Sequence, residues 1–193
     1  MVSSSHPEKL VNELNRNGAK CTLVNSLEQA SAAIGSMITE RSFKTVAKTR
    51  NAPLDPIFCE NLKRKGVDVF EVPGEFDNRE NLARADMGIT GADFGLAESG
   101  TIVVSTDTDS ERLVSSLPYS HVAIVSSRNI FPSLREAAPH LRKLFLSDSR
   151  VPRRRSVTLI SGPSRTADIE MVLVRGVHGP NELFVVIVED FPI

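Results

Sequence analysis

Unbroken runs of β-branched and other apolar residues constrain the fold of this chain more than any other feature. Such runs occupy residues 101–106, 121–126, 156–161 and 183–188, with little alternation of polar and apolar side chains. A strand with one solvated face alternates, whereas a strand buried on both faces is apolar throughout. These runs therefore predict a sheet that is covered by helices.

Segments with helical periodicity separate these runs. Apolar residues recur at helical spacing in residues 6–17, 27–38 and 132–146, and shorter helices are expected at 55–65 and 78–85. Pro139 predicts a kink in the third segment, or its division into two short helices. A further helix is expected over residues 166–175. The alternation of helices and strands indicates the α/β class with a largely parallel sheet.

Length and composition exclude several classes of protein. The 193 residues suit one domain, which we divide into an N-terminal helical segment (1–40) packed on a main domain (41–193). The 23 Lys and Arg nearly balance the 24 Asp and Glu, so the basic excess typical of nucleic-acid binding is absent. The chain begins without an apolar signal segment, and its longest apolar run is too short to cross a bilayer. We expect a cytoplasmic protein.

Cysteine and histidine usage predicts that this chain binds no metal and no iron–sulfur cluster. Cys21 and Cys59 are the two cysteines, and no Cys-x-x-Cys pair occurs. The four histidines are scattered without the paired spacing of metal ligands.

A glycine-rich stretch at residues 88–101 is the first candidate for a functional site. Four glycines lie between two apolar strands, where they would let the backbone approach a ligand closely. The same stretch carries Asp93 and Glu98. Glu98 precedes a buried strand, where a carboxylate can act as a base, a nucleophile or a hydroxyl acceptor. The structural alternative is a set of turn glycines with the carboxylate bonded to loop amides.

Two later segments add candidate residues. Residues 161–170 combine Ser164, Arg165, Thr166 and Asp168 at an expected helix start, where free amides, hydroxyls and a guanidinium suit an anion. Alternatively, the carboxylates of this turn satisfy the helix dipole or pair with the arginine. His178 lies in the turn before the last strand, either as a structural residue or beside this segment. Arg112 is a further cationic candidate, with a local salt bridge as the simpler explanation.

These segments resemble the LUD-domain family. The resemblance rests on GITGADFGLAESGT at 88–101, Arg112 with LP at 117–118, HVAIV at 121–125, GPSRTADIE at 162–170 and GVHGP at 176–180. It covers roughly residues 86–190 in matching order and spacing, and it is looser over residues 1–85. It implies a three-layer α/β/α sandwich similar to the fold of sugar-phosphate isomerases and CoA transferases.

The resemblance also implies a function. The chain would serve a system that oxidises L-lactate to pyruvate, as a subunit or accessory of partner proteins that carry iron–sulfur clusters. CoA transferases of the related fold use a glutamate nucleophile, and residues 97–100 are similar to that loop at two of four positions. We assign Glu98, as a carboxylate that faces a ligand pocket, and His178 as catalytic candidates. The predicted substrate contacts are Asp93, Arg112, Ser164, Arg165, Thr166 and Asp168.

Two other functions remain open at this stage. A stand-alone enzyme acting on a small anionic substrate, such as a CoA ester, a phosphosugar or a folate, would bring Glu98, Arg165 and His178 together in one deep pocket. In a purely structural binding module, substitutions at Glu98, Arg165 and Asp168 would change stability and leave activity unaffected.

Overall fold

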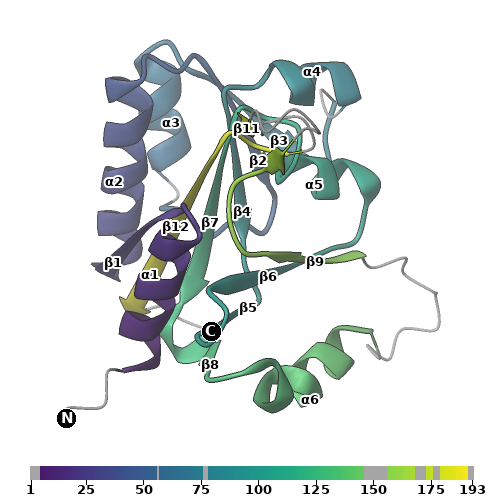
Figure 1. The fold of residues 1–193 in the computed structure, drawn as a ribbon. Helices are drawn as coiled ribbons and strands as arrows, with labels where there is room; N and C mark the ends of the chain where they lie inside the picture. Colours follow the sequence, from purple (N-terminus) through teal and green to yellow (C-terminus); the bar gives the residue numbers. More distant parts are fainter. Residues whose placement is uncertain are drawn as a thin grey trace.

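A central sheet of six parallel strands organises the computed structural model (Figure 1). The structure describes residues 5–55, 57–75, 78–145, 156–167, 173–175 and 179–190, with the backbone alone for 165–167, 173–175 and 190. The strand order is β1-β12-β7-β4-β2-β3, and neighbouring strands pair in parallel. The bounds are β1 Lys20–Ser26, β2 Thr45–Thr49, β3 Asp68–Val72, β4 Met87–Gly91, β7 Ser120–Ser126 and β12 Glu182–Asp190. The predicted α/β class with a parallel sheet is confirmed.

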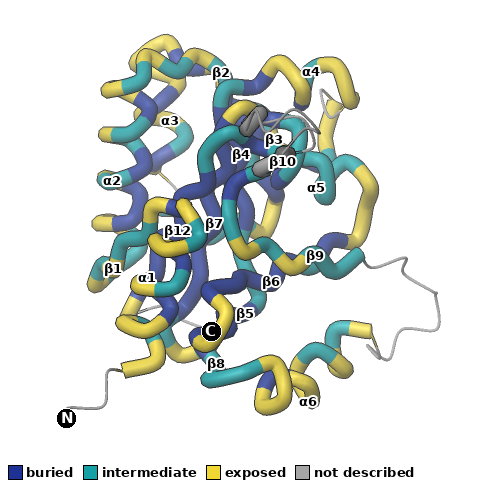
Figure 2. The backbone as a smooth tube through the Cα atoms, in the orientation of Figure 1, coloured by how far each residue is buried: buried dark blue, intermediate teal, exposed yellow. Residues whose placement is uncertain are grey.

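The middle of this sheet is buried on both faces, as the unbroken apolar runs predict (Figure 2). All seven residues of β7 are buried, and residues 183–188 of β12 are at most 3% exposed. Parallel strands with both faces covered read as near-continuous apolar sequence for this reason.

Helices α2 (Leu27–Glu40) and α3 (Phe58–Arg64) cover one face of the sheet. Ser26 begins α2, because its side-chain oxygen accepts a hydrogen bond from the backbone N–H of Gln29 at 3.3 Å. The apolar faces of the two helices then pack on the face of the sheet that carries the even-numbered side chains of β7 and β12. Their contacts include Ala30, Ile34, Ile38, Phe58 and Leu62 from the helices and Val122, Ile124, Phe184, Val186 and Val188 from the strands.

The opposite face is covered by helices and by a second, smaller sheet. Helix α1 (His6–Arg16) inserts Leu10 and Leu14 against β7 and β12, and both leucines are fully buried. Helices α4 (Arg79–Arg84) and α5 (Asp109–Val114) pack over β2 and β3 through Leu82 and Val114. With layers on both faces of the central sheet, the expected three-layer sandwich is confirmed.

The second sheet has the strand order β8-β5-β6-β9. Its members are β5 Phe94–Leu96, β6 Thr101–Thr106, β8 Ile130–Phe131 and β9 Ser156–Ile160, and β8 follows a short 3-10 turn, η1 Ser127–Asn129. Strands β6 and β9 were expected from their sequences, but they pair antiparallel here and lie outside the parallel sheet. Helix α6 (Leu134–Phe145) covers the outer side of this sheet through Ala137 and Leu141.

Two of the predicted helical segments differ from the structure. The helix expected over residues 166–175 is wrong, because β10 (Arg165–Ala167) and β11 (Leu173–Arg175) pair as antiparallel strands. The β-branched Thr166 and Val174 favour extended backbone, and short apolar runs do not separate helix from strand by spacing alone. Pro139 does not divide its segment, since α6 runs through it as one helix.

The N-terminal segment does more than pack a helix on the main domain. Its strand β1 pairs with β12, and therefore forms one edge of the central sheet. The boundary near residue 40 stays a prediction.

Candidate functional site

A polar crevice lies where the strand order of the central sheet reverses direction. Strands β2 and β4 are neighbours in the sheet. After β2 the chain continues to β3 on one side of this pair, and after β4 the next strand of the sheet is β7 on the other side. Ligands of open α/β sheets bind outside the carboxyl ends of the strands at such a point. A cavity of about 150 Å³ is found there, and we call it the switch-point crevice. It is lined by Asn51, Asp93, Ser105, Thr106, Asp107 and Glu111.

Asp93 connects three elements at this crevice. Its two carboxylate oxygens accept hydrogen bonds from the backbone N–H of Ser105 at 2.6 Å and from the Ser105 hydroxyl at 3.0 Å. Its backbone carbonyl accepts from the Asn129 amide at 3.1 Å, after the end of β7. Asp93 was predicted as a substrate contact. It lines a cavity, but its contact with substrate stays a prediction.

The crevice is rich in hydrogen-bond acceptors. It presents three carboxylates, and no Lys, Arg or His is among the described residues that line it. The Thr106 hydroxyl is buried and makes no hydrogen bond within the described part of the chain. Carboxylate and hydroxyl oxygens of this kind can accept hydrogen bonds from a ligand hydroxyl. Over the described ranges, no group of three His, Cys, Asp or Glu is placed to hold a metal ion.

The four glycines of residues 88–101 make room for protein atoms. A Cβ added to Gly88 would lie 2.0 Å from the Val114 carbonyl oxygen of α5. A Cβ on Gly95 would lie 2.6 Å from the Leu10 side chain, and Gly100, at φ 61°, is equally close to α1. A Cβ on Gly91 would meet the Asn51 carbonyl oxygen at 3.1 Å. These positions explain the glycines by packing, where the sequence had suggested close approach to a ligand.

Glu98 stabilises the start of α6. Its Oε1 accepts a hydrogen bond from the backbone N–H of Leu134 at 3.3 Å, and its own N–H donates to the Pro132 carbonyl at 3.0 Å. The residue is exposed and does not line the switch-point crevice. The structure therefore provides a structural reason for this carboxylate, and its catalytic role stays a prediction.

Two variants of Glu98 test whether its carboxylate caps helix α6. Glu98→Ala removes the cap and should lower the free energy of unfolding by about 1 kcal/mol. Glu98→Gln keeps an oxygen acceptor and should unfold within about 0.5 kcal/mol of the wild type. Urea unfolding followed by circular dichroism measures both, with Glu136→Gln in the first turn of α6 as the control. Equal losses for the Ala and Gln variants would contradict the capping assignment.

Hydrogen bonds join the three sequence segments into one strip. The Thr101 and Ser161 hydroxyls are 2.8 Å apart, which joins the first segment to the second. The backbone N–H of Ser164 donates to the Pro180 carbonyl at 3.1 Å, which joins the second to the third. Asp93 lies apart from this strip. Its partner Ser105 is four residues along β6 from Thr101, a distance of about 13 Å in a strand.

The other predicted residues are placed only in part. Arg112 forms an ion pair with Asp109 at 3.7 Å within α5, which is the local salt bridge offered as its simpler explanation. Arg165 and Thr166 lie in β10, so the helix N-terminus that was expected to supply amides there is replaced by a strand. Asp168 and His178 lie outside the described residues. Their roles, and the convergence of Glu98, Arg165 and His178, stay predictions.

Comparisons with known proteins identify the family. The model of the LUD domain matches residues 7–188. The chain belongs to the LUD domain family. It is 35% identical to lactate utilization protein C of Halalkalibacterium halodurans, over 95% of this chain and 80% of that protein. It is 41% identical to lactate utilization protein C of Macrococcus caseolyticus, over 69% of this chain and 57% of that protein.

A crystal structure of another protein has a similar fold. The crystal structure of a DUF162 family protein from Deinococcus radiodurans matches with a TM-score of 0.63 and 22% identity. The match covers 96% of this chain and 99% of the other, so the two folds agree over nearly all of the LUD domain.

Sequence reasoning missed most of the switch-point crevice. Asn51 follows β2 as Asp93 follows β4, and a polar residue after each of two buried strands is a readable signal. That β2 and β4 are neighbours is not readable, because β3 lies between them in the chain and beside β2 in the sheet. Asp107 and Glu111 were not among the predicted site residues.

Proposed function

We propose that this chain acts in the oxidation of L-lactate to pyruvate, as a subunit or accessory of partner proteins that carry iron–sulfur clusters. The observation that carries the proposal is its 35–41% identity to proteins named lactate utilization protein C. In this proposal the chain works in the cytoplasm and carries no redox cofactor of its own.

The two cysteines support placing the iron–sulfur clusters on partners. Cys21 packs with the residues between the sheet and α1, whereas Cys59 packs on the opposite face of the sheet. Burial raises the pKa of the Cys21 thiol to about 12, and cluster ligation requires a thiolate. These two thiols are therefore poorly suited to share one cluster.

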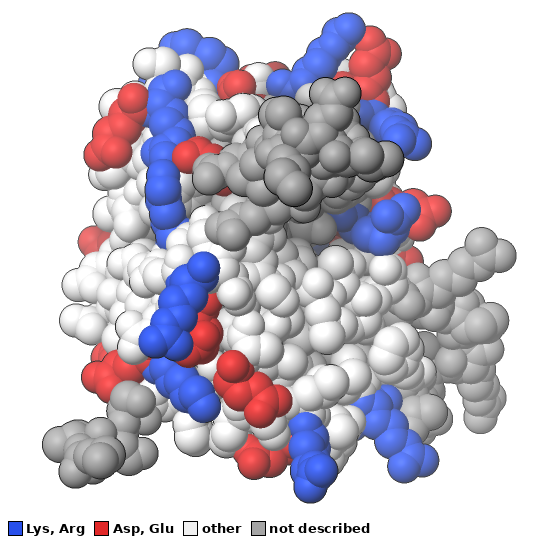
Figure 3. Space-filling model, viewed as in Figure 1, with Lys and Arg blue, Asp and Glu red and all other residues white. Residues whose placement is uncertain are grey.

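The face of the molecule shown in Figure 3 is compatible with protein partners. On the face shown in Figure 3, Lys and Arg side chains are interspersed with Asp and Glu around the rim, and the middle is largely uncharged. None of the described helices has the length and apolarity needed to span a bilayer. A groove of about 680 Å³ lies between α2 and α3, and none of the predicted site residues line it.

A reconstitution experiment tests the proposal. The chain is co-purified from its native host, and L-lactate-dependent reduction of an electron acceptor is measured with and without it. We expect the partners alone to lose most of their activity and the added chain to restore it. Full lactate oxidation by the partners alone would refute the proposal. Turnover of a phosphosugar, CoA ester or folate by the isolated chain would favour the stand-alone enzyme instead.

A further inference from the structure

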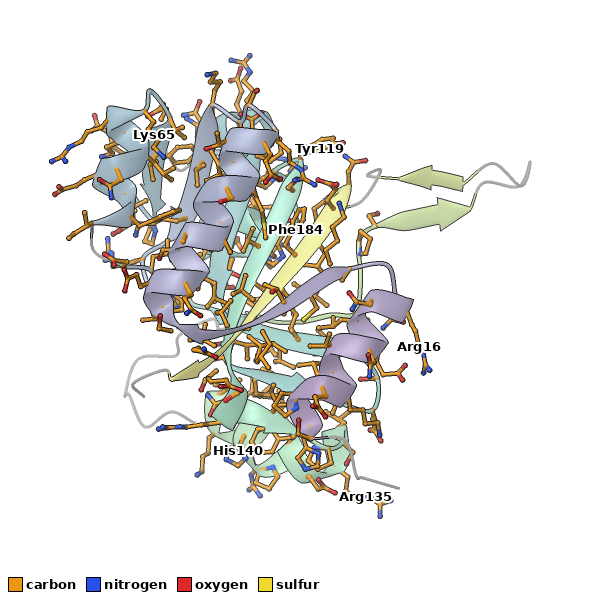
Figure 4. All side chains as sticks on the ribbon, turned by 90° about the vertical axis from the view of Figure 1, so that its left-hand side faces the viewer. Arg16, Lys65, Tyr119, Arg135, His140 and Phe184 are labelled. Carbon is orange, nitrogen blue, oxygen red and sulfur yellow. The ribbon has the colours of Figure 1, made fainter. Side chains whose placement is uncertain are left out.

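A second cavity also borders Asp93, between α6, the start of β5, η1 and β8. We call it the α6 cavity, and its volume is about 240 Å³. It is lined by Asp93, Phe94, Asn129, Phe131, His140, Lys143 and Leu144. Figure 4 shows His140 at the α6 end of the molecule, far from Tyr119, which precedes β7. Asp93 follows β4 and Asn129 follows β7, so this side of the cavity adjoins the carboxyl edge of the central sheet.

Three rings form most of its apolar surface. The Phe94 and Phe131 rings meet edge to face with centroids 5.6 Å apart, and the Phe131 and His140 rings are 4.5 Å apart. Phe94 is 2% exposed and fixed in β5, whereas His140 is exposed. The cavity thus has a rigid apolar floor and opens to solvent beside α6.

Besides Asp93, its polar groups are His140, Lys143 and Asn129. His140 and Lys143 are three residues apart and share one face of α6. Within the described part of the chain, neither makes an ion pair or a side-chain hydrogen bond. The Asp93 carboxylate is bonded to Ser105, which lines the switch-point crevice and not this cavity. Both oxygens of the Asp93 carboxylate are therefore engaged by Ser105.

We infer that the α6 cavity binds a small monocarboxylate, with the carboxylate at Lys143 and the apolar part of the ligand on the Phe94 and Phe131 rings. An apolar cavity with a few convergent polar groups is the usual form of a small-molecule site. One ammonium and one imidazole match a single negative charge, whereas phosphate sites use arginine forks or several backbone amides. The volume is below the range for drug-sized ligands, so the ligand is small.

This inference rests on the proposed function in one respect: L-lactate and pyruvate belong to the ligand class. Neither was expected at α6, because the sequence had indicated an anion near residues 161–170. It also gives the two cavities beside Asp93 different chemistry. The switch-point crevice is lined by three carboxylates, while the α6 cavity adds Lys143 and His140 beside Asp93.

Binding to the isolated full chain tests the inference. The ¹⁵N-labelled protein is titrated with pyruvate, with L-lactate and with benzoate, whose ring reports on the aromatic floor. We expect amide shift changes at residues 93–94, 129–131 and 140–144. Benzamide, which lacks the charge, should bind about tenfold more weakly than benzoate. Shift changes elsewhere, absence of binding, or equal affinity for benzamide would each overturn the inference.

Two matched variants locate the charge. Lys143→Gln should weaken benzoate binding about tenfold, because the carboxylate loses its cationic partner. Arg142→Gln removes the neighbouring exposed cation, which does not line the cavity, and should change the affinity by less than about twofold. Equal weakening by both variants would indicate a general charge effect and contradict the site. Retained lactate oxidation in the reconstituted system with no carboxylate binding refutes this site alone. Binding with no partner-dependent activity refutes the proposed function alone.

Discussion

Replacing Gly88 with alanine should lower the free energy of unfolding by about 3 kcal/mol. Gly88 lies in the buried strand β4, and an added Cβ would be 2.0 Å from the Val114 carbonyl oxygen and 3.1 Å from the Pro118 ring. A backbone carbonyl cannot rotate aside as a flexible side chain does, so β4 and α5 would have to separate. Domain stabilities are about 5–15 kcal/mol, which makes this loss a large fraction of the total.

Gly35→Ala is the matched control for this prediction. A Cβ at Gly35 meets its nearest neighbour, the Phe58 ring, at 3.6 Å, which is ordinary van der Waals contact. Gly35 is inside helix α2, where alanine is favoured over glycine by about 1 kcal/mol. Urea unfolding should therefore show the two Gly→Ala changes moving stability in opposite directions. A Gly88→Ala protein as stable as the wild type would show that α5 adapts without cost.

Acidification should destabilise the protein through His121. Burial lowers the pKa of this imidazole to about 3 from 6.5. Its Nε2 lies 2.9 Å from the Thr90 hydroxyl, and its Nδ1 is buried without a hydrogen-bond partner in the described part of the chain. The unfolded chain therefore binds a proton below pH 6.5 that the folded chain does not bind until about pH 3. Stability is fully present above pH 6.5 and falls as the pH drops toward 3.

Between pH 7 and pH 5 this histidine should remove about 2 kcal/mol from the free energy of unfolding. His121→Gln should abolish that part of the pH dependence, and His121→Met serves if the glutamine variant folds poorly. Thr90→Val is the control, since it removes the hydrogen bond but keeps the titrating imidazole, and so should retain the slope. Urea unfolding at several pH values measures all three. An unchanged slope in both His121 variants would refute the assignment.

Much of the fold was readable from the sequence because it follows from burial. The runs at 121–126 and 183–188 are apolar throughout because β7 and β12 are central, covered strands. Sheet membership was not readable. Strand β6 has the same kind of sequence, yet it pairs antiparallel with β5 and β9 in the second sheet. Partner choice depends on contacts between distant segments, which local periodicity does not encode.

Only the part of the candidate site that comes shortly after a single strand was predictable from the sequence. Asp93 comes directly after β4, so its place at the carboxyl edge could be inferred from sequence. The α6 cavity depends on His140 and Lys143, which approach Phe94 only because α6 packs on the second sheet. A helix face shows no sign in the sequence of which strand it will cover. For the same reason, His140 had no recognisable context.

The position of β12 has a consequence for how this protein is synthesised. Strand β1 pairs with β12, with Lys20 opposite Phe184, so the two partners are 164 residues apart in the chain. During synthesis, β1 leaves the ribosome long before β12 has been made. Strand β7 is also made before β12, its partner on one side. The sheet can close only when synthesis has passed β12. Until then, the unpaired backbone N–H and C=O groups of β1 and β7 are exposed to chaperones and to other nascent chains.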